Sequence, residues 1–287
     1  MEGVEEMQAD VAAKPRATEV DCIQPGGFLL ELSLDWIVLR ASENVHRLLG
    51  ESHVTLIGEP LERFVRAQTL HDIRNLFSRL SGTTGIARAY AVRLTDEQDL
   101  FDLAFQLSDG HVLLEGVPSP AEAFGEAFGS VGGLIAGLAD NSGQSLLDGG
   151  CRRMRALTGY DRVTVTFGEG RAESTRGAFR SASDPADLPA IVADSEHPGV
   201  PLFPRDEAET SATQALLRAP TREQQDRLRA DGIRSILRVP FKSNGNCGEF
   251  CCEGRSPRAP NFELHAAAEL FAQLFAMRLE IHRLKNG

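Results

Sequence analysis

The hydrophobic pattern of the first third of the chain predicts two strands followed by helices. Residues 28–33 and 36–42 are apolar runs of strand length on either side of a short turn. Residues 43–50 then have a helical pattern that ends at Gly50. Residues 67–80 place apolar side chains at helical spacing. This segment therefore begins as strand, strand, helix, helix.

Three further strands are predicted before residue 118. Residues 101–107 alternate large apolar side chains with polar or small ones, which predicts one buried face and one face in water. Asp109-Gly110 separates this run from residues 111–117, and an Asp-Gly pair in this position is typical of a two-residue hairpin. Residues 86–94 also have a strand pattern, so an antiparallel sheet is expected.

The second half of the chain predicts an antiparallel sheet flanked by helices. Helices are expected at 123–139, 144–159 and 221–232 and from 261 onward, and strands at 162–168, 172–179, 235–242 and 247–254. The Pro-rich residues 183–220 are expected to be irregular. This order of elements predicts an α+β fold with two domains.

Length and charge narrow the classes of function. The 287 residues suffice for about two domains, and the net charge of −11 disfavours direct contact with nucleic acid, which needs a basic face. No apolar run approaches the ~20 residues that span a bilayer, and the start has no signal-peptide pattern, so a cytoplasmic protein without a membrane partner is expected. Five cysteines, an odd number spread over a long chain, favour reduced thiols.

One short motif carries a resemblance to a known family. Ile23-Gln24-Pro25-Gly26-Gly27 resembles the signature that opens the PAS domain of bacterial phytochromes. Further strings follow in the order of that family, at 42–50, 101–117, 159–163, 216–219 and 231–233. The resemblance implies a bacteriophytochrome PAS–GAF photosensory module. Its expected parts are a disordered tail at 1–18, a PAS domain at 19–117, a linker at 118–122 and a GAF domain at 123–287 with a C-terminal output helix.

The resemblance also implies a linear tetrapyrrole, such as biliverdin, bound by the GAF domain. Asp187-Leu188-Pro189 matches the Asp-Ile-Pro motif of the family, in which the aspartate and its carbonyl face the pyrrole nitrogens. Arg218 matches an arginine that pairs with a propionate. A guanidinium binds a carboxylate best when it donates two hydrogen bonds to it, so one such arginine instead of two should weaken binding.

Three positions depart from the pattern of the family. Gln224 and Glu253 stand where histidines contact the bilin in the family, and Thr166 stands where a tyrosine is common. The sequence thus predicts a degenerate bilin pocket formed by the matching and the departing residues.

Cys22 is the candidate thiol for attachment of a bilin. The family normally uses a cysteine about a dozen residues before the signature, and no cysteine precedes Cys22. Cys22 either forms the thioether from its own position or is a small apolar residue that fills space. The second alternative is favoured, so non-covalent binding is expected.

Other candidate chemistry has weaker support. Cys247, Cys251 and Cys252 have the spacing of a metal cluster, but adjacent strand residues face opposite sides, so core packing is expected. The acidic residues at 184, 187, 194 and 196 lack a paired nucleophile, so they are expected to be carboxylates of a loop in solvent. We therefore expect no enzymatic activity.

The last helix carries a broad apolar stripe that includes Leu264, Phe271, Met277, Ile281 and Leu284. Part of the stripe should pack on its own domain, and the rest predicts a homodimer through this helix, as output helices form in the family. The alternative is a helix that is wholly covered by its own domain. Two functions follow: a bilin-binding sensory module that acts on a signalling partner, or a bilin-free PAS–GAF module for interaction and dimerisation.

Overall fold

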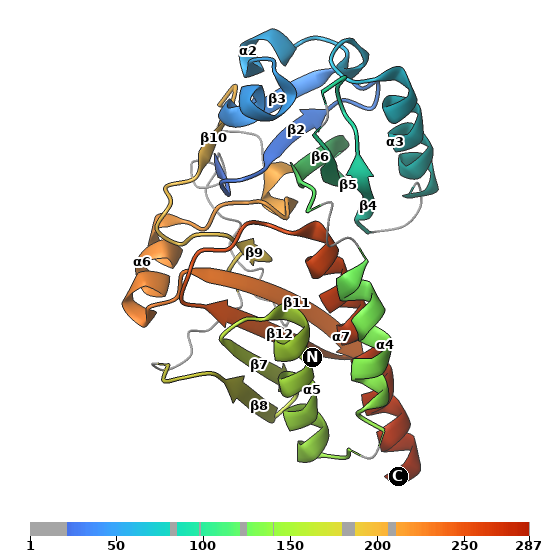
Figure 1. Cartoon of the computed structure of the whole chain (residues 1–287), viewed down its shortest axis with the longest axis vertical. Helices are drawn as coiled ribbons and strands as arrows, with labels where there is room; N and C mark the ends of the chain where they lie inside the picture. Colours follow the sequence, from blue (N-terminus) through green and yellow to red (C-terminus); the bar gives the residue numbers. More distant parts are fainter. Residues whose placement is uncertain are drawn as a thin grey trace, which may run out of the picture.

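The computed structural model describes residues 22–80, 85–97, 99–120, 125–139, 141–179, 187–205 and 211–286. Within these residues it contains two antiparallel sheets with helices packed against them, as Figure 1 shows. The predicted α+β class is confirmed.

The N-terminal sheet has seven strands in the order β1-β10-β3-β2-β6-β5-β4. Six come from the first 118 residues: β1 (Cys22–Ile23), β2 (Phe28–Leu32), β3 (Val38–Ser42), β4 (Ala87–Val92), β5 (Phe101–Ser108) and β6 (His111–Pro118). Asp109 and Gly110 both have positive φ, +48° and +84°, so the predicted hairpin turn between β5 and β6 is confirmed.

Short helices cover one face of this sheet. They are α1 (His46–Leu49), α2 (His53–Leu56), α3 (Ala67–Leu80) and the 3₁₀ segments η2 (Glu43–Val45) and η3 (Leu61–Arg63). The helix predicted at 67–80 has these same bounds in α3. Its apolar side packs into a core with Phe28, Trp36 and Phe105.

The second face of the N-terminal sheet is not in water, so this part of the prediction for 101–107 is wrong. Asp102 and Ala104 are fully buried, and Gln106 is nearly so. The cause is a segment from the second half of the chain that packs on this face. The side-chain amide of Gln106 donates a hydrogen bond to the carbonyl of Gln214 in this segment (2.8 Å).

The Pro-rich residues 183–220 are also more regular than predicted. They contain β9 (Ile191–Val192), β10 (Val200–Phe203) and the 3₁₀ segment η4 (Ser211–Gln214). β10 lies between β1 and β3 and pairs with both, so a strand from the second half of the sequence completes the N-terminal sheet (Figure 1).

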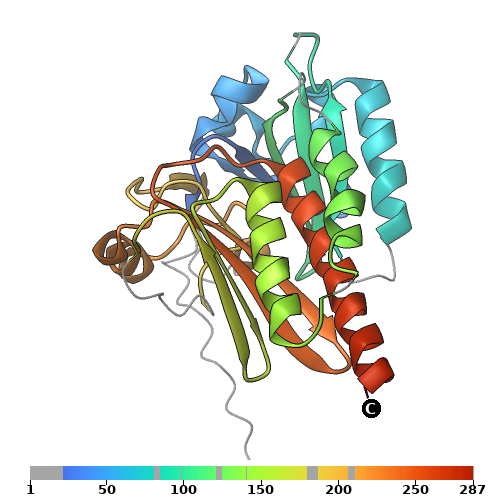
Figure 2. The ribbon, with the colours of Figure 1, turned by 60° about the horizontal axis from the view of Figure 1, so that its bottom comes forward.

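The C-terminal sheet has the order β8-β7-β12-β11-β9. Its other strands are β7 (Arg162–Phe167), β8 (Gly170–Thr175), β11 (Ser235–Ser243) and β12 (Asn246–Gly254). Three helices cover one face, as Figure 2 shows: α4 (Glu126–Ala136), α5 (Gln144–Thr158) and α7 (Phe262–Asn286). Helix α6 (Arg222–Asp231) lies on the other side.

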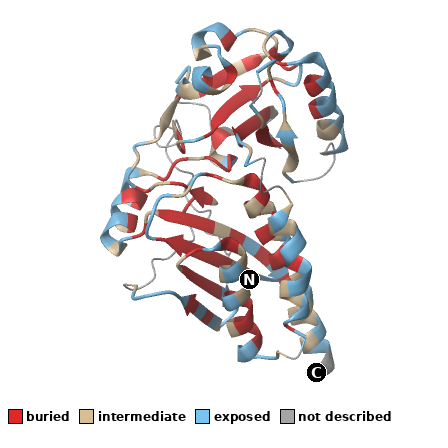
Figure 3. Ribbon diagram, viewed as in Figure 1, coloured by how far each residue is buried: buried red, intermediate tan, exposed pale blue. Residues whose placement is uncertain are grey.

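Aromatic rings form the centre of this second core. Phe250 of β12 contacts Phe271 and Phe275 of α7 edge to face, with centroids 5.9 and 5.1 Å apart. Phe241 of β11 contacts the same group. The central strands of both sheets are mostly buried, whereas the edge strands β4 and β8 and the outer sides of the helices are more exposed (Figure 3).

Among the described residues, no helix is both long enough and apolar enough to cross a lipid bilayer.

Candidate functional site

The site predicted from sequence lies on the face of the C-terminal sheet that the three long helices leave uncovered. On β7, Val163 and Val165 belong to the core beneath the helices, so Arg162 and Thr164 point to the other side. Antiparallel pairing places Glu253 opposite Arg162. The residues that meet on this face come from β7, β12, β11 and the segment before β9.

Three of the predicted residues come together around the main chain of Asp187. The carbonyl oxygen of Asp187 accepts hydrogen bonds from the side-chain amide of Gln224 (2.7 Å) and from the guanidinium of Arg218 (3.4 Å). Leu188 and Pro189 follow directly, and Leu188 is buried against α6 and the sheet.

Gln224 is held in place by the start of its own helix. Its side-chain oxygen accepts from the N–H of Thr221 (2.8 Å), and the Thr221 hydroxyl accepts from the N–H of Gln224 (3.2 Å). This reciprocal pair is a capping box, which satisfies two N–H groups at the start of α6. Both ends of the Gln224 amide are therefore engaged, one with the helix and one with Asp187.

The carboxylate of Asp187 faces Arg227 and not a vacant site. Arg227 Nη2 lies 2.9 and 3.1 Å from the two carboxylate oxygens. Burial alone would raise the pKa of Asp187, but the hydrogen bonds and charge of Arg227 bring this pKa below its ordinary value. Asp187 therefore stays ionised and offers its main-chain carbonyl, not its carboxylate, to the site.

Arg218 and Arg238 form the cationic part of the site. Burial lowers the pKa of Arg218, and the nearby charge of Arg238 lowers it further. Arg238 pairs with Glu249 (2.7 Å) and donates to the carbonyl of Leu188. Among the residues that the structure describes, no carboxylate lies within ion-pair distance of Arg218, so an anion placed there would gain a half-buried cation as its partner.

Glu253 belongs to a different set of contacts. It forms a buried ion pair with Arg162, and both side chains are 2–3% exposed. The guanidinium of Arg162 also lies under the ring of Phe179, 4.5 Å from its centroid, and Arg255 lies 4.3 Å from the same centroid. Glu253 thus neutralises an arginine of the protein itself. Thr166, at the far end of β7, is exposed.

Cys22 does not face the Asp187 group. It lies on β1 opposite Pro201 and lines a separate cavity of about 460 Å³ together with Gln225 and Arg229 of α6. Each residue turns an α-helix by ~100°, so the side of α6 that carries Gln225 and Arg229 differs from the side on which Gln224 contacts Asp187.

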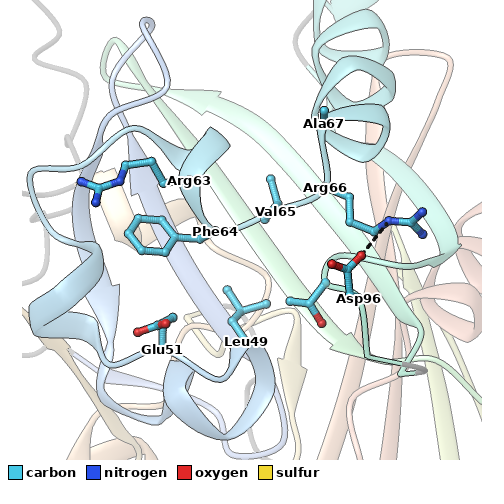
Figure 4. A pocket seen from close by; sticks show the side chains of 9 residues that line it. Leu49, Glu51, Arg63, Phe64, Val65, Arg66, Ala67 and Asp96 are labelled. Carbon is cyan, nitrogen blue, oxygen red and sulfur yellow. Dashed lines mark ion pairs between the residues drawn. The ribbon is translucent and has the colours of Figure 1, made fainter.

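Another cavity, of about 500 Å³, lies in the N-terminal domain between the end of α1 and the start of α3. Figure 4 shows Arg66 turned toward Asp96, with which it forms an ion pair of 3.5 Å. Arg63 pairs with Glu59. Because its arginines are paired with surface carboxylates, this cavity adds no chemistry to the site.

The remaining candidates take structural positions. Cys251 and Cys252 are buried on opposite faces of β12, and Cys247 is exposed. Asp194 and Glu196 both pair with Arg234, at 2.9 and 3.1 Å. Asp184 lies outside the described residues.

Sequence reasoning missed several residues that complete the site. Arg162, Arg227 and Arg238 contact predicted site residues, but nothing in their local sequence marks them, because their partners lie on other elements. The Thr221-x-x-Gln224 pattern was readable as a capping box, and it would have predicted that the Gln224 side chain serves the helix.

Comparison with known proteins shows what the chain is similar to. Residues 14–116 match the family described as PAS fold. The bacteriophytochrome of Pseudomonas aeruginosa is 25% identical over 296 aligned residues, which cover 92% of this chain. The fold is that of the PAS–GAF chromophore-binding domains of bacteriophytochromes, to which the chain is similar over most of its length.

Solved structures support the same fold for both domains. The chromophore-binding domain of an unusual bacteriophytochrome from R. palustris has a TM-score of 0.73 at 20% identity, and the alignment covers 93% of this chain and 97% of that one. The chromophore-binding domain of Stigmatella aurantiaca phytochrome P1 has a TM-score of 0.74 at 22% identity, with 91% and 97% covered. The module spans 39% of the length of the Pseudomonas relative.

Proposed function

We propose that this PAS–GAF module is sensory and binds a linear tetrapyrrole such as biliverdin without a covalent bond. The observation that carries the proposal is Arg218, a half-buried guanidinium at the carbonyl of Asp187 that forms no ion pair with any described carboxylate. A tetrapyrrole propionate is an anion of the kind that such a guanidinium binds.

The residues present fit this group in part. Arg218, with Arg238 beside it, would hold a propionate, and the Asp187 carbonyl would accept from pyrrole N–H groups. A bound tetrapyrrole would supply absorption of red light. The neutral amide of Gln224 would keep the Asp187 segment in place through its bond to the carbonyl.

The position of Cys22 supports non-covalent binding. Its thiol lines a cavity on a different side of α6 from the Asp187 group, and thioether formation needs a thiolate within reach of the vinyl group. Cys22 is therefore expected to serve packing at the β1–β10 pair.

A bilin-free interaction module is the second candidate, and one observation favours it. The Arg162–Glu253 ion pair and the Gln224–Asp187 bond satisfy buried polar groups of the site with groups of the protein itself. A site that is internally satisfied gains less from a ligand, because the ligand must replace existing bonds.

Both candidates would act through a homodimer formed by α7, with a signalling protein as the further partner. Leu270, Met277, Ile281 and Leu284 on this helix are 38–75% exposed. Together with Leu274 they follow one another at intervals of four and three residues, the spacing of a coiled-coil seam.

Titration of the purified chain with biliverdin tests the proposal. We expect a red to far-red absorbance band, and no zinc-enhanced fluorescent band on a denaturing gel, with the same result for Cys22→Ser. Arg218→Ala should weaken binding by roughly tenfold or more. Arg229→Ala is the matched control, because Arg229 lies on the other side of α6.

The outcomes separate the candidates. A chain that shows no red absorbance at saturating biliverdin is the bilin-free module. A fluorescent band that survives denaturation and is lost in Cys22→Ser would overturn the non-covalent assignment.

A further inference from the structure

The segment that presents Arg218 to the GAF site is held from behind by a buried carboxylate of the PAS domain. Glu115 lies on β6, on the sheet face toward the GAF domain, and is 1% exposed. Its two oxygens accept the main-chain N–H groups of Leu216 (3.0 Å) and Leu217 (2.6 Å). These residues directly precede Arg218.

The signature residue Gln24 holds the same segment from a second side. Its main-chain N–H donates to the carbonyl of Leu217 (2.6 Å), and its side-chain amide donates to the carbonyl of Arg218 (3.3 Å). Its side-chain oxygen accepts from the N–H of Ala193 (3.0 Å), next to β9. Gln24 is 1% exposed, so water does not compete for these bonds.

Three successive GAF residues are thus fixed through their main chain by two PAS side chains. Arg218 then extends its guanidinium to the carbonyl of Asp187. We propose that Gln24 and Glu115 form an interdomain clamp that positions Arg218, and that docking of residues 216–218 is coupled to the proton on Glu115.

The surroundings of Glu115 explain the coupling. Burial raises the pKa of Glu115 to about 7, although the N–H groups of Leu217 and Leu216 and the charge of Arg88 favour the ionised form. Arg88 on β4 is opposite Ala104, which is itself opposite Glu115. Apolar Leu29 lies on the other flank, on β2.

Other charged groups surround Arg88 or lie on the same face of the sheet as Glu115. From α7, Glu269 pairs with Arg88 (2.8 Å) and His265 shares a hydrogen bond with it (2.9 Å). On the same face of the sheet, Asp102 accepts from the N–H of Ala91 (3.0 Å), and Glu31 lies beside Arg40.

Linkage fixes the sign of the effect. When residues 216–218 detach, water reaches Glu115 and its pKa returns toward the ordinary value of 4.5. The docked state therefore binds more protons than the detached state, so docking weakens as pH rises from about 5 to about 7. The clamp depends only on hydrogen bonds between the two domains, and it stands whether or not a tetrapyrrole binds.

Amide hydrogen exchange of the ligand-free chain tests the clamp. In Glu115→Ala, residues 216–218 should exchange roughly tenfold faster, because two N–H groups lose their acceptor. In the wild type, protection of this segment should fall as pH rises, after correction for intrinsic exchange. Glu115→Gln should remove this pH profile. Glu31→Gln, a buried carboxylate of the same sheet without bonds to this segment, should keep it.

An unchanged pH profile in Glu115→Gln, or unchanged exchange in Glu115→Ala, would overturn the proposal. If either variant fails to fold, an NMR titration of the wild-type protein tests the coupling instead. The amide signals of Leu216 and Leu217 should shift with the same midpoint as the carboxyl carbon of Glu115. Amide signals that do not follow the titration of Glu115 would refute the coupling.

Discussion

Gly27, the last residue of the signature motif, is required by close contact between the domains. A Cβ atom on Gly27 would lie 2.6 Å from a methyl carbon of Leu217 and 2.8 Å from the carbonyl oxygen of Gly116. Leu217 belongs to the segment held by Gln24 and Glu115. The motif thus combines a glutamine that binds the GAF segment with a glycine that lets it approach.

Gly27→Ala should therefore destabilise the protein by about 2 kcal/mol, because one of the contacting atoms belongs to the backbone and cannot rotate away. Chemical denaturation measures the effect. Gly132→Ala is the control: Gly132 lies inside α4 with no atom within 4 Å of its added Cβ, so alanine should stabilise by about 0.5–1 kcal/mol. An equal change in the free energy of unfolding of the two variants would contradict the close-contact explanation.

His265 predicts a second pH dependence at the domain interface. Burial lowers the pKa of His265 to about 4, and Arg88 adds to this effect against the opposing charge of Glu269. The folded-state pKa of His265 lies below the ordinary 6.5. Neutral His265 therefore contributes its full share to the free energy of unfolding above about pH 6.5, and this contribution is lost as pH falls toward 4.

The unfolding free energy should accordingly fall on acidification over this window, by an amount on the order of 3 kcal/mol from His265. Glu115 acts in the opposite direction, because its raised pKa reduces stability as pH rises toward 7. Urea unfolding of His265→Gln should lose the acid-side dependence and keep the Glu115 contribution. A variant with the same acid-side slope as the wild type would contradict this assignment.

At the scale of elements, the pairing of β7 with β12 places Arg162 against Glu253 on the face of the GAF sheet that α4, α5 and α7 leave uncovered. Removing one partner of a buried ion pair leaves a charge without compensation, whereas removing both leaves only a packing change. The two strands therefore depend on the pair jointly, although neither residue has a sequence neighbour that identifies its partner.

Glu253→Gln should cost about 3–5 kcal/mol in unfolding free energy, and the double variant Arg162→Met, Glu253→Leu should cost less than the single one. Asp226→Asn, in the exposed pair with Arg229, should change stability by less than about 1 kcal/mol. Denaturant titration of the four proteins completes the comparison. If the double variant is the least stable, the pair is a net source of stability.

At the scale of the whole molecule, the two domains share strands, and α7 leaves an apolar edge uncovered. β10 crosses from the GAF sequence into the PAS sheet, and Arg88 of the PAS domain pairs with Glu269 of α7. Together with the contacts of Gln24 and Glu115, these contacts connect the GAF site to the PAS domain, and α7 is the helix through which the proposed dimer would form.

Light scattering after size-exclusion chromatography tests the proposed dimer. Met277→Glu together with Leu284→Glu should convert a dimer to a monomer at micromolar concentration, because the charges would be buried in the seam. Leu107→Glu, at an exposed leucine of β5, should leave the dimer unchanged. A wild-type chain that elutes as a monomer would remove the proposal.

The sequence by itself determined most helices and strands outside residues 183–220, the Asp109-Gly110 hairpin, helix α3 and the resemblance to bacteriophytochromes, because periodicity, turns and short motifs are local properties of a chain. Only the tertiary structure decided that β10 joins the PAS sheet and that the second face of β5 is buried. It also separated Cys22 from Asp187 and paired Glu253 with Arg162. These contacts join residues that are far apart in the sequence, and a hydrogen bond or ion pair between distant elements leaves no periodic trace in either one.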